Sequence, residues 1–304
     1  MAGVSPHGVL VVDKPRGPTS HDLVALARRH FATRRVGHAG TLDPMATGVM
    51  LLLFGEATKL SRHLAGSDKR YQATICFGIG TDTLDADGQV TERRDPLDFE
   101  LPLDQLDAAL AAELVRTEQI PPLVSALKVA GRRAHRLARQ GECVTLPARP
   151  VRISQLARLH VAGHELVVDA VVSKGYYVRA LARDLGGRLG LPAHLSKLRR
   201  LASGPFEIDE AVSWPPPAET RLLPPEQAAR RALPNIRLTS AGALHAANGR
   251  RLGDDDFADD PAPSHDQAEA QGQAVAWLAP DGQLVALGQR RAANHYAVVR
   301  GFRW

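Results

Sequence analysis

The chain has 304 residues, of which 44% are hydrophobic and 23% charged, as is typical of a globular protein with about two domains. Its formal net charge is +5, its longest apolar run (residues 49–54) is too short to cross a bilayer, and residues 1–6 do not resemble a signal peptide. Because Cys76 and Cys143 are the only cysteines, neither a disulfide framework nor a cysteine-based zinc site is expected. We therefore predict a reduced, cytoplasmic protein without a membrane partner.

The first third of the chain alternates short apolar runs with helical spacing. Thr19 or Ser20 can cap a helix that ends near His30, after a Pro- and Gly-rich break. Around this helix the pattern predicts two buried strands at residues 8–13 and 48–54, a helix at 56–64, a strand at 71–77 and a polar turn at 81–88.

The middle of the chain also shows the hydrophobic periods of helices and of strands. Helical spacing recurs at residues 103–115 and 134–139, and residues 178–189 predict an amphipathic helix that carries Arg179. Two strands are expected at residues 151–159 and 165–172, joined by a turn. Strands that alternate with helices, with paired strands among them, predict a mixed α/β (α+β) fold whose mixed β-sheet has flanking helices.

A composition change follows Trp214, where two proline clusters suggest a linking segment. We expect a smaller β-rich unit from residue 233, with strands at 274–278, 284–289 and 296–300 and a Pro-Asp-Gly hairpin turn. Residues 254–270 contain six Asp, one Glu and few apolar side chains, so we predict a mobile acidic loop there.

Charge is segregated along the chain. Residues 127–202 contain fifteen Lys and Arg against four Asp and Glu, whereas residues 73–126 contain three against eleven. This asymmetry predicts a basic face suited to a polyanion, although arginine-rich helices also solvate well without binding anything.

One short loop, GHAGTLDPMATG at residues 37–48, holds a single carboxylate, Asp43, between glycines that allow close approach of the backbone to a ligand. Neither the paired acids of a glycosidase nor metal-ligand spacing surrounds it. Two interpretations remain open on these residues alone: a turn residue before Pro44, which is a common role for Asp-Pro, and a lone catalytic acid.

An ordered set of motifs resembles the TruB family of tRNA pseudouridine synthases and covers residues 8–201. The motifs are GVLVVDKP (8–15), VGHAGTLDPMATG (36–48), GEATK (55–59), KRY (69–71), TDTLDADG (81–88), QIPPLVSALK (119–128), ARQG (138–141), Arg149-Pro150, SKGYYVR (173–179), DLG (184–186) and LRRL (198–201). The resemblance implies a pseudouridine-synthase-like catalytic domain at 1–232 and a small β-rich, PUA-like RNA-binding domain at 233–304.

The resemblance also implies an activity, the isomerisation of uridine-55 in the T loop of tRNA. The base is flipped out, its N1–C1′ bond breaks, the base turns and C5 joins C1′, so no atom is gained or lost. The same resemblance implies that Asp43 is the essential catalytic residue. It also implies that Arg179 supplies the charge that keeps this acid ionised and that Tyr71 stacks on the uracil. No cofactor and no metal are expected, and no phosphate loop or dinucleotide fingerprint occurs in the sequence.

Substrate contacts follow from the same resemblance. Tyr177 and Leu198 are expected to line the base pocket, and His38 to fill or contact the space that the flipped base leaves. Basic residues assigned as a group to phosphate contacts are Lys14, Lys59, Lys69, Arg132, Arg133, Arg136, Arg139, Arg199 and Arg200. The chain departs from many family members at His135, where they have tyrosine, which leaves any aromatic contact from this position in doubt.

Three functions fit these residues. The first is a stand-alone synthase that acts as a monomer on the T arm of tRNA and needs no protein partner. The second is a noncatalytic tRNA-binding or tRNA-folding protein, and the third is a guide-RNA-dependent catalytic subunit. The Asp43, Tyr71 and Arg179 set favours catalysis, and the absence of a long basic tail argues against the guided subunit.

Overall fold

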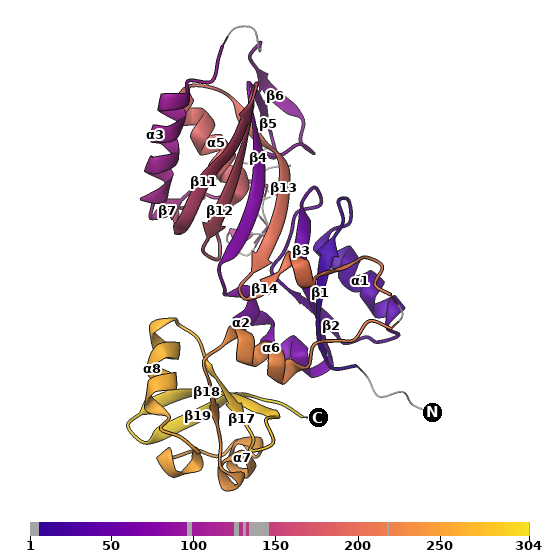
Figure 1. The fold of residues 1–304 in the computed structure, drawn as a ribbon, viewed down its shortest axis with the longest axis vertical. Coiled ribbons are helices and arrows are strands. Elements are labelled where there is room, and N and C mark those ends of the chain that lie inside the picture. The colour runs from indigo at the N-terminus through magenta and orange to yellow at the C-terminus, as the bar shows by residue number, and fades with distance from the viewer. Residues whose placement is uncertain are drawn as a thin grey trace.

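The computed structural model describes residues 6–95, 99–124, 128–129, 132–133, 146–217 and 219–303, with the backbone alone at 128–129 and 132–133. A large sheet with helices forms the upper and middle parts of the molecule, and a smaller unit built from the last residues lies below it (Figure 1). Every helix in these described ranges is too short or too polar to span a lipid bilayer.

Within the described residues, the central sheet has nine strands, in the order β11-β12-β4-β13-β3-β1-β15, with β2 beside β3 and β14 beside β13. Its β1–β15 and β3–β13 pairs are parallel and the others antiparallel, so the predicted mixed sheet is confirmed. These strands are β1 (Gly8–Lys14), β2 (Val36–Ala39), β3 (Thr47–Phe54), β4 (Lys69–Phe77), β11 (Ile153–Ala162), β12 (Glu165–Val172), β13 (Ala193–Ser203), β14 (Phe206–Glu207) and β15 (Val212–Ser213).

The half of the sheet built from β1, β2 and β3 follows the sequence prediction closely. Helix α1 (Ser20–His30) begins at Thr19, whose side chain accepts from the backbone N–H of Asp22 while the Asp22 carboxylate accepts from that of Thr19. The expected helix at residues 56–64 is instead a 3₁₀ helix, η1 (Gly55–Leu60), continued by α2 (Ser61–Ala65). Gly55, directly after β3, takes a positive φ of 56°.

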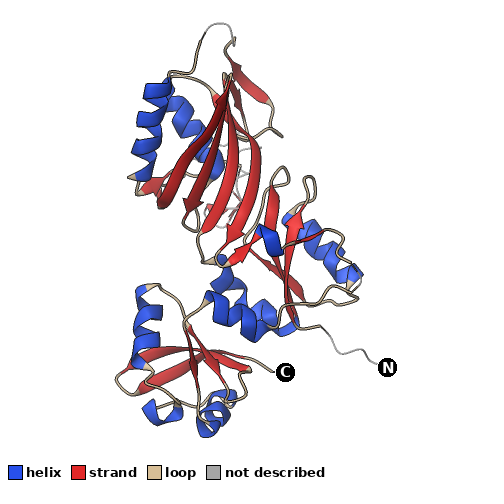
Figure 2. Ribbon diagram, viewed as in Figure 1, coloured by secondary structure: helices blue, strands red, loops and turns tan. Residues whose placement is uncertain are grey.

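The other half of the sheet carries two helices on one face, α3 (Leu103–Leu114) and α5 (Val178–Leu189) (Figure 2). Both were predicted, as were β4, β11 and β12, whereas the central strand β13 was not. β13 contains two irregularities, at Leu195/Lys197 and Arg200/Ala202, so its side chains do not alternate with a period of two. The helical spacing predicted at residues 134–139 falls outside the described residues.

Short elements complete the part of the chain before the C-terminal unit. The predicted polar turn lies between β5 (Ile79–Thr81) and β6 (Val90–Arg93), which form a small hairpin. The remaining pairs are β7 (Glu118–Gln119) with β10 (Arg149–Pro150), and β8 (Lys128–Val129) with β9 (Arg132–Arg133). The segment after β13 contains η3 (Ile208–Glu210) and α6 (Pro225–Ala232).

The C-terminal unit contains a four-stranded sheet in the order β16-β17-β18-β19, with bounds Asn235–Arg237, Val275–Leu278, Leu284–Ala292 and His295–Gly301, which confirms the three predicted strands. Its helices are α7 (Ser240–Ala247), η4 (Asp254–Asp256) and α8 (Ala262–Ala270). The predicted acidic loop at 254–270 is therefore wrong. The sequence prediction treated His265 of α8 as a polar residue. In the structure its ring is buried against Phe257, Trp277 and Tyr296, and this contact packs α8 onto the C-terminal unit.

The C-terminal unit is attached to the rest of the chain by apolar and charged contacts. One buried cluster joins residues of β1 and β3 to residues of β17 and β18. Beside it, Lys59 donates to the Gly301 carbonyl at 2.7 Å and lies over the Phe302 ring. The buried Glu56 carboxylate accepts from the Arg303 backbone N–H at 2.8 Å. The two units thus share part of one core.

Only two residue pairs, Thr47 with Arg199 and Gly48 with Arg200, join the two halves of the central sheet through β3 and β13. Gly48 has a φ of 101°, and a Cβ at this position would lie 2.2 Å from the Arg200 carbonyl oxygen. Only glycine allows the two strands to meet at this distance. Residues 40–46, which contain Asp43, directly precede this junction.

We predict that Gly48→Ala lowers the free energy of unfolding by about 3 kcal/mol, because the new methyl group meets backbone atoms that cannot move aside. The measurement is urea unfolding followed by circular dichroism. Gly187→Ala in α5 is the control, since its added methyl has no atom within 4 Å, and it should be neutral or stabilising. Equal stability of the two variants would contradict the account.

Candidate active site

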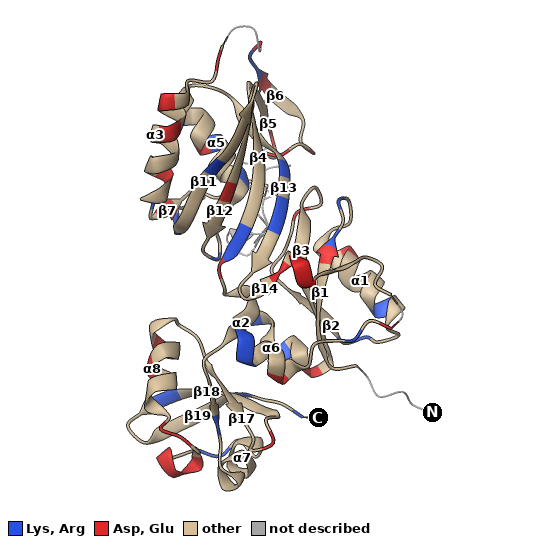
Figure 3. Ribbon diagram, viewed as in Figure 1, with Lys and Arg blue, Asp and Glu red and all other residues tan. Residues whose placement is uncertain are grey.

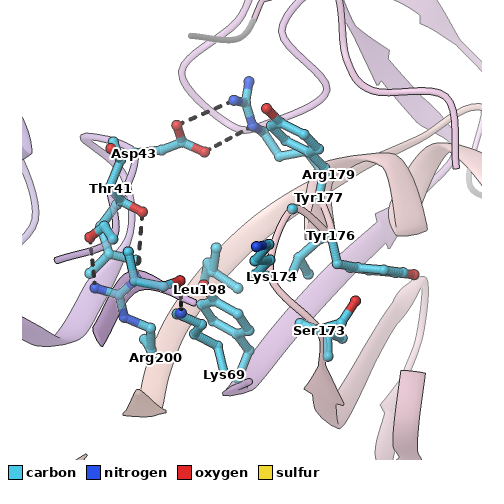
Figure 4. A pocket seen from close by; sticks show the side chains of 17 residues that line it. Thr41, Asp43, Lys69, Ser173, Lys174, Tyr176, Tyr177, Arg179, Leu198 and Arg200 are labelled. Carbon is cyan, nitrogen blue, oxygen red and sulfur yellow. Dashed lines mark hydrogen bonds and ion pairs between the residues drawn. The ribbon is translucent and has the colours of Figure 1, made fainter. Parts of the chain in front are cut away.

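The junction of the two half-sheets contains a cavity of about 280 Å³. The loop at residues 40–43 lines one side, and α5 with the segment before it lines the other (Figure 4). Tyr71 of β4 and Leu198 of β13 contribute the apolar part of the lining. The structure thus brings together Asp43, Tyr71, Tyr177, Arg179 and Leu198, five of the residues predicted for the site.

Asp43 and Arg179 face each other across this cavity (Figure 4). The Arg179 Nε lies 2.9 Å from the Asp43 Oδ2, and its Nη2 donates to the Oδ1 at 3.2 Å. The Arg179 side chain is 6% exposed, whereas that of Asp43 is 34% exposed. The carboxylate is therefore held on one side by a buried guanidinium and remains accessible to a ligand on the other.

The ionisation of Asp43 reflects opposing effects. Burial raises the pKa of its carboxyl above the ordinary value, because a less polar environment disfavours the charged form. The Arg179 guanidinium lowers the pKa, the nearby Asp85 carboxylate raises it, and the Lys14 ammonium lowers it. Arg179 is thus the largest favourable contribution to keeping the acid ionised.

A second carboxylate shares Arg179. The guanidinium Nη1 lies 3.3 Å from the Asp85 Oδ2 and donates to the Thr83 carbonyl at 3.0 Å. The turn at residues 81–88 is fixed to β13, because the Ala86 N–H donates to the Leu195 carbonyl and the Leu195 N–H to that of Leu84. Asp85 therefore orients the arginine from behind while Asp43 faces the cavity.

Two buried basic side chains hold the backbone of the Asp43 loop in place. Lys14 is fully buried and its ammonium donates to the carbonyls of Pro15, Pro44 and Ala46 at 2.9, 3.3 and 2.7 Å. Arg200, 1% exposed, donates to the carbonyls of Gly40 and Thr41 at 3.2 and 3.5 Å. These cations satisfy carbonyl groups that would otherwise be buried without partners.

A hydroxyl completes the anchoring of this loop. The Ser20 Oγ accepts from the Leu42 N–H at 2.8 Å and donates to the Leu42 carbonyl at 2.9 Å. Ser20 is the first residue of α1 and is 2% exposed. The residue directly before Asp43 is therefore tied to a helix end, which limits how far the carboxylate can move.

Two predicted phosphate contacts have internal roles in this structure. Lys14 holds the loop as described, and burial lowers its pKa to about 8. Lys69 is 7% exposed, donates to the Ala65 carbonyl at 2.6 Å, and has a pKa lowered by burial to about 8. Their donors are bonded to backbone carbonyls in this structure, so the phosphate contacts of both residues stay predictions.

Other predicted phosphate contacts also have partners within the chain. Arg200 holds the Asp43 loop, Lys59 contacts the C-terminal unit, and Arg199 lies 2.7 Å from the Asp13 carboxylate. The side chains of Arg132, Arg133, Arg136 and Arg139 fall outside the described part of the structure. Basic residues do gather on β4 and β13 beside the cavity (Figure 3).

His38 lies on β2, outside the cavity lining. Its ring contacts that of His21 edge-on at 5.8 Å, and its Nδ1 is buried with no hydrogen-bond partner among the described residues. Burial lowers the pKa of His38, and His21 and Arg200 lower it further, which favours the neutral ring. The predicted contact of His38 with the space left by the base stays a prediction.

The sequence analysis missed several residues that build the site: Ser20, Thr83, Asp85, Gln119 and Lys174. Asp85 lies within the TDTLDADG motif, but nothing in the sequence indicates that this turn meets Arg179. Lys174 belongs to the SKGYYVR motif and is an exposed cation that lines the cavity. Within the described residues, no group of three or more His, Cys, Asp or Glu is arranged to bind a metal ion.

Comparison with known proteins agrees with this geometry. The model of the TruB family pseudouridylate synthase N-terminal domain matches residues 28–178, and that of the tRNA pseudouridylate synthase B C-terminal domain matches residues 179–215. The tRNA pseudouridine synthase B of Thermobifida fusca (strain YX) is 41% identical over 309 residues, 96% of this chain and 97% of that protein. The chain belongs to the TruB family.

Further relatives extend this assignment. The tRNA pseudouridine synthase B of Mycobacterium tuberculosis (strain ATCC 25618 / H37Rv) is 44% identical over 285 residues, 90% of this chain and 92% of that protein. A crystal structure of a Cbf5-Nop10-Gar1 complex matches with a TM-score of 0.74 at 23% identity, over 98% of this chain and 84% of that one. This structural similarity supports the TruB-type fold.

We predict that Asp85→Asn moves the acid limb of the rate–pH profile to lower pH. The Asp85 charge raises the Asp43 pKa, so its removal lets Asp43 stay ionised in more acidic solution. The measurement is the single-turnover rate on a tRNA transcript between pH 5 and 9. Asp104→Asn on α3, an exposed carboxylate, is the control. A shift of the limb to higher pH would contradict this electrostatic account.

Proposed function

We propose that this chain isomerises uridine to pseudouridine in tRNA, at uridine-55 of the T loop. The observation that carries the proposal is the pairing of Asp43 with buried Arg179 beside Tyr71 and Leu198, in a chain of a family whose named relatives are tRNA pseudouridine synthases. A noncatalytic RNA-binding protein has no need of a carboxylate that must be kept charged against its burial.

The reaction needs an ionised carboxylate beside the ribose of the target uridine. There Asp43 attacks C1′, stabilises positive charge that develops on the sugar, or removes a proton from C2′. The N1–C1′ bond breaks, the uracil turns, C5 bonds to C1′, and the C5 hydrogen leaves as a proton while N1 gains one. All atoms of the nucleotide are retained, so the reaction requires no oxidant or reductant.

The cavity accounts for the way in which the base is held. A uridine inside folded tRNA is stacked, so it must swing out to reach Asp43. Tyr71 then stacks on the uracil, Leu198 and Tyr177 close the apolar side, and His38 takes the space that the base leaves. Arg179 stays with Asp43 throughout, because its guanidinium is also held by Asp85 and Thr83.

We further propose that residues 1–232 form the catalytic domain and residues 233–304 a PUA-like RNA-binding domain. Leu233 ends α6, and a separate four-stranded sheet follows it. The tRNA pseudouridine synthases B that resemble this chain match it over nearly their whole length. This favours a stand-alone enzyme, a monomer in the cytoplasm without a protein partner, over a subunit of a guide-RNA particle.

We predict that Asp43→Asn abolishes tritium release from a tRNA transcript labelled at C5 of uridine, because an amide cannot supply the negative charge. Binding of the transcript should stay within about tenfold, or 1.4 kcal/mol. Asp104→Asn, the exposed carboxylate on α3, should keep full activity. Full activity of Asp43→Asn would refute the catalytic role of this residue.

We predict that tRNA affinity falls steeply as salt rises from about 50 to 200 mM, because phosphate contacts release counterions. Lys174→Gln, on the cavity side, should reduce the slope of log affinity against log salt by about 1. Lys197→Gln, an exposed residue of β13 that does not line the cavity, should leave it unchanged. If the tRNA affinity of the wild-type protein does not change with salt, the proposed basic face is contradicted.

A further inference from the structure

Gln119 forms a two-point contact with a backbone segment far away in the sequence. Its Oε1 accepts from the Tyr177 N–H at 2.9 Å, and its Nε2 donates to the Tyr177 carbonyl at 3.2 Å. The side chain is buried, with the residue 2% exposed. The oxygen and the nitrogen of the amide therefore both bond the backbone of Tyr177, a residue of the cavity wall, as a neighbouring strand would.

The contact falls at the start of α5. Tyr177 is the N-cap of this helix and provides no side-chain cap, so its first turn lacks the usual stabilising group. The Tyr177 carbonyl also accepts from the Leu181 N–H at 3.2 Å, as the first hydrogen bond of the helix. Gln119 thus fixes the residue from which α5 begins, and Arg179 lies two positions further along.

Gln119 is itself held on both sides. Its strand β7 pairs with β10, where Gln119 lies opposite Arg149. The next residue, Ile120, accepts through its carbonyl from the Arg183 Nη2 at 2.9 Å, a side chain of α5. The amide is therefore a rigid link between β7 and the start of α5.

Arg179 has little freedom to absorb a displacement of this helix start. Its guanidinium contacts Asp43 through two nitrogens and Asp85 and Thr83 through the third. A planar fork of this kind loses contacts when its backbone moves by about an ångström. The side chain of Tyr177, on the same segment, lines the cavity.

We propose that Gln119 is a positioning residue for the isomerisation, whose amide holds Tyr177 so that Arg179 and the Tyr177 ring stay aligned with Asp43 and the base. This inference rests on the proposed function. Gln119 is not among the residues that line the cavity, and its effect passes through the backbone of Tyr177.

Gln119→Glu tests the link because its two protonation states differ in one hydrogen bond. A neutral carboxyl group can accept from the Tyr177 N–H and donate to the Tyr177 carbonyl, as the amide does. An ionised carboxylate only accepts, and it repels that carbonyl. The ionisable groups near this position on the surrounding elements are Glu113, Arg116, Glu118, Arg149, Tyr176, Tyr177, Arg179, Arg183, Asp184 and Arg188.

The experiment measures single-turnover pseudouridine formation in a tRNA transcript at pH 5.5 and 8.5, with folding at each pH checked by circular dichroism. We expect the rate of Gln119→Glu relative to wild type to fall at least tenfold between the two pH values. At pH 5.5 the neutral carboxyl group of the variant keeps both hydrogen bonds, so Arg179 and the acid limb of Asp43 are the same in both proteins there. Gln155→Glu, exposed on β11, is the matched control and should keep a constant ratio.

Gln119→Met removes both hydrogen bonds. It is a second test of the inference, which applies even if Gln119→Glu does not fold. We expect a deficit of at least tenfold in rate at both pH values, with affinity for tRNA within threefold of wild type. A constant ratio for folded Gln119→Glu, or a wild-type rate for Gln119→Met, overturns the positioning role. Wild-type protein that forms no pseudouridine overturns the proposed function and this inference with it.

Discussion

The site depends on one balance, between the burial of Asp43 and the guanidinium of Arg179. Burial alone would favour a neutral carboxyl, which has no charge to offer the ribose of a substrate. Arg179 offsets part of this effect, because it is itself buried and its charge is little screened by water. Asp85 opposes the arginine electrostatically, yet it holds the guanidinium in place. The geometry of α5 and of the turn at residues 81–88 therefore influences the charge of Asp43, which lies in the other half of the sheet, between β2 and β3.

The loop that carries Asp43 is kept in position by groups whose burial is costly unless they are paired. An ammonium or guanidinium removed from water requires partners for its donors, and Lys14 and Arg200 find them in loop carbonyls. Ser20 ties the residue before Asp43 to α1. Such over-determined backbone is expected where a single carboxylate must meet a substrate within a few tenths of an ångström.

Much of the fold could be predicted from periodicity, because β1, β3, β12 and α5 show clear apolar patterns. β13 could not, since its irregular register removes the alternation on which the prediction relies. The pairing of Asp43 with Arg179 was expected from motif resemblance, whereas the contribution of Asp85 depends on how a distant turn packs. The internal contacts of Lys14 and Lys69 could not be predicted, because a sequence shows a cation without showing whether backbone carbonyls surround it.

The most direct test of this account is the titration of Asp43 itself. Carboxyl carbon NMR, with the signal assigned by its loss in Asp43→Asn, gives the pKa in wild-type protein and in Arg179→Met. The account predicts a wild-type midpoint above that of an ordinary aspartate, and a still higher midpoint without the guanidinium. The same midpoint in both proteins would contradict it.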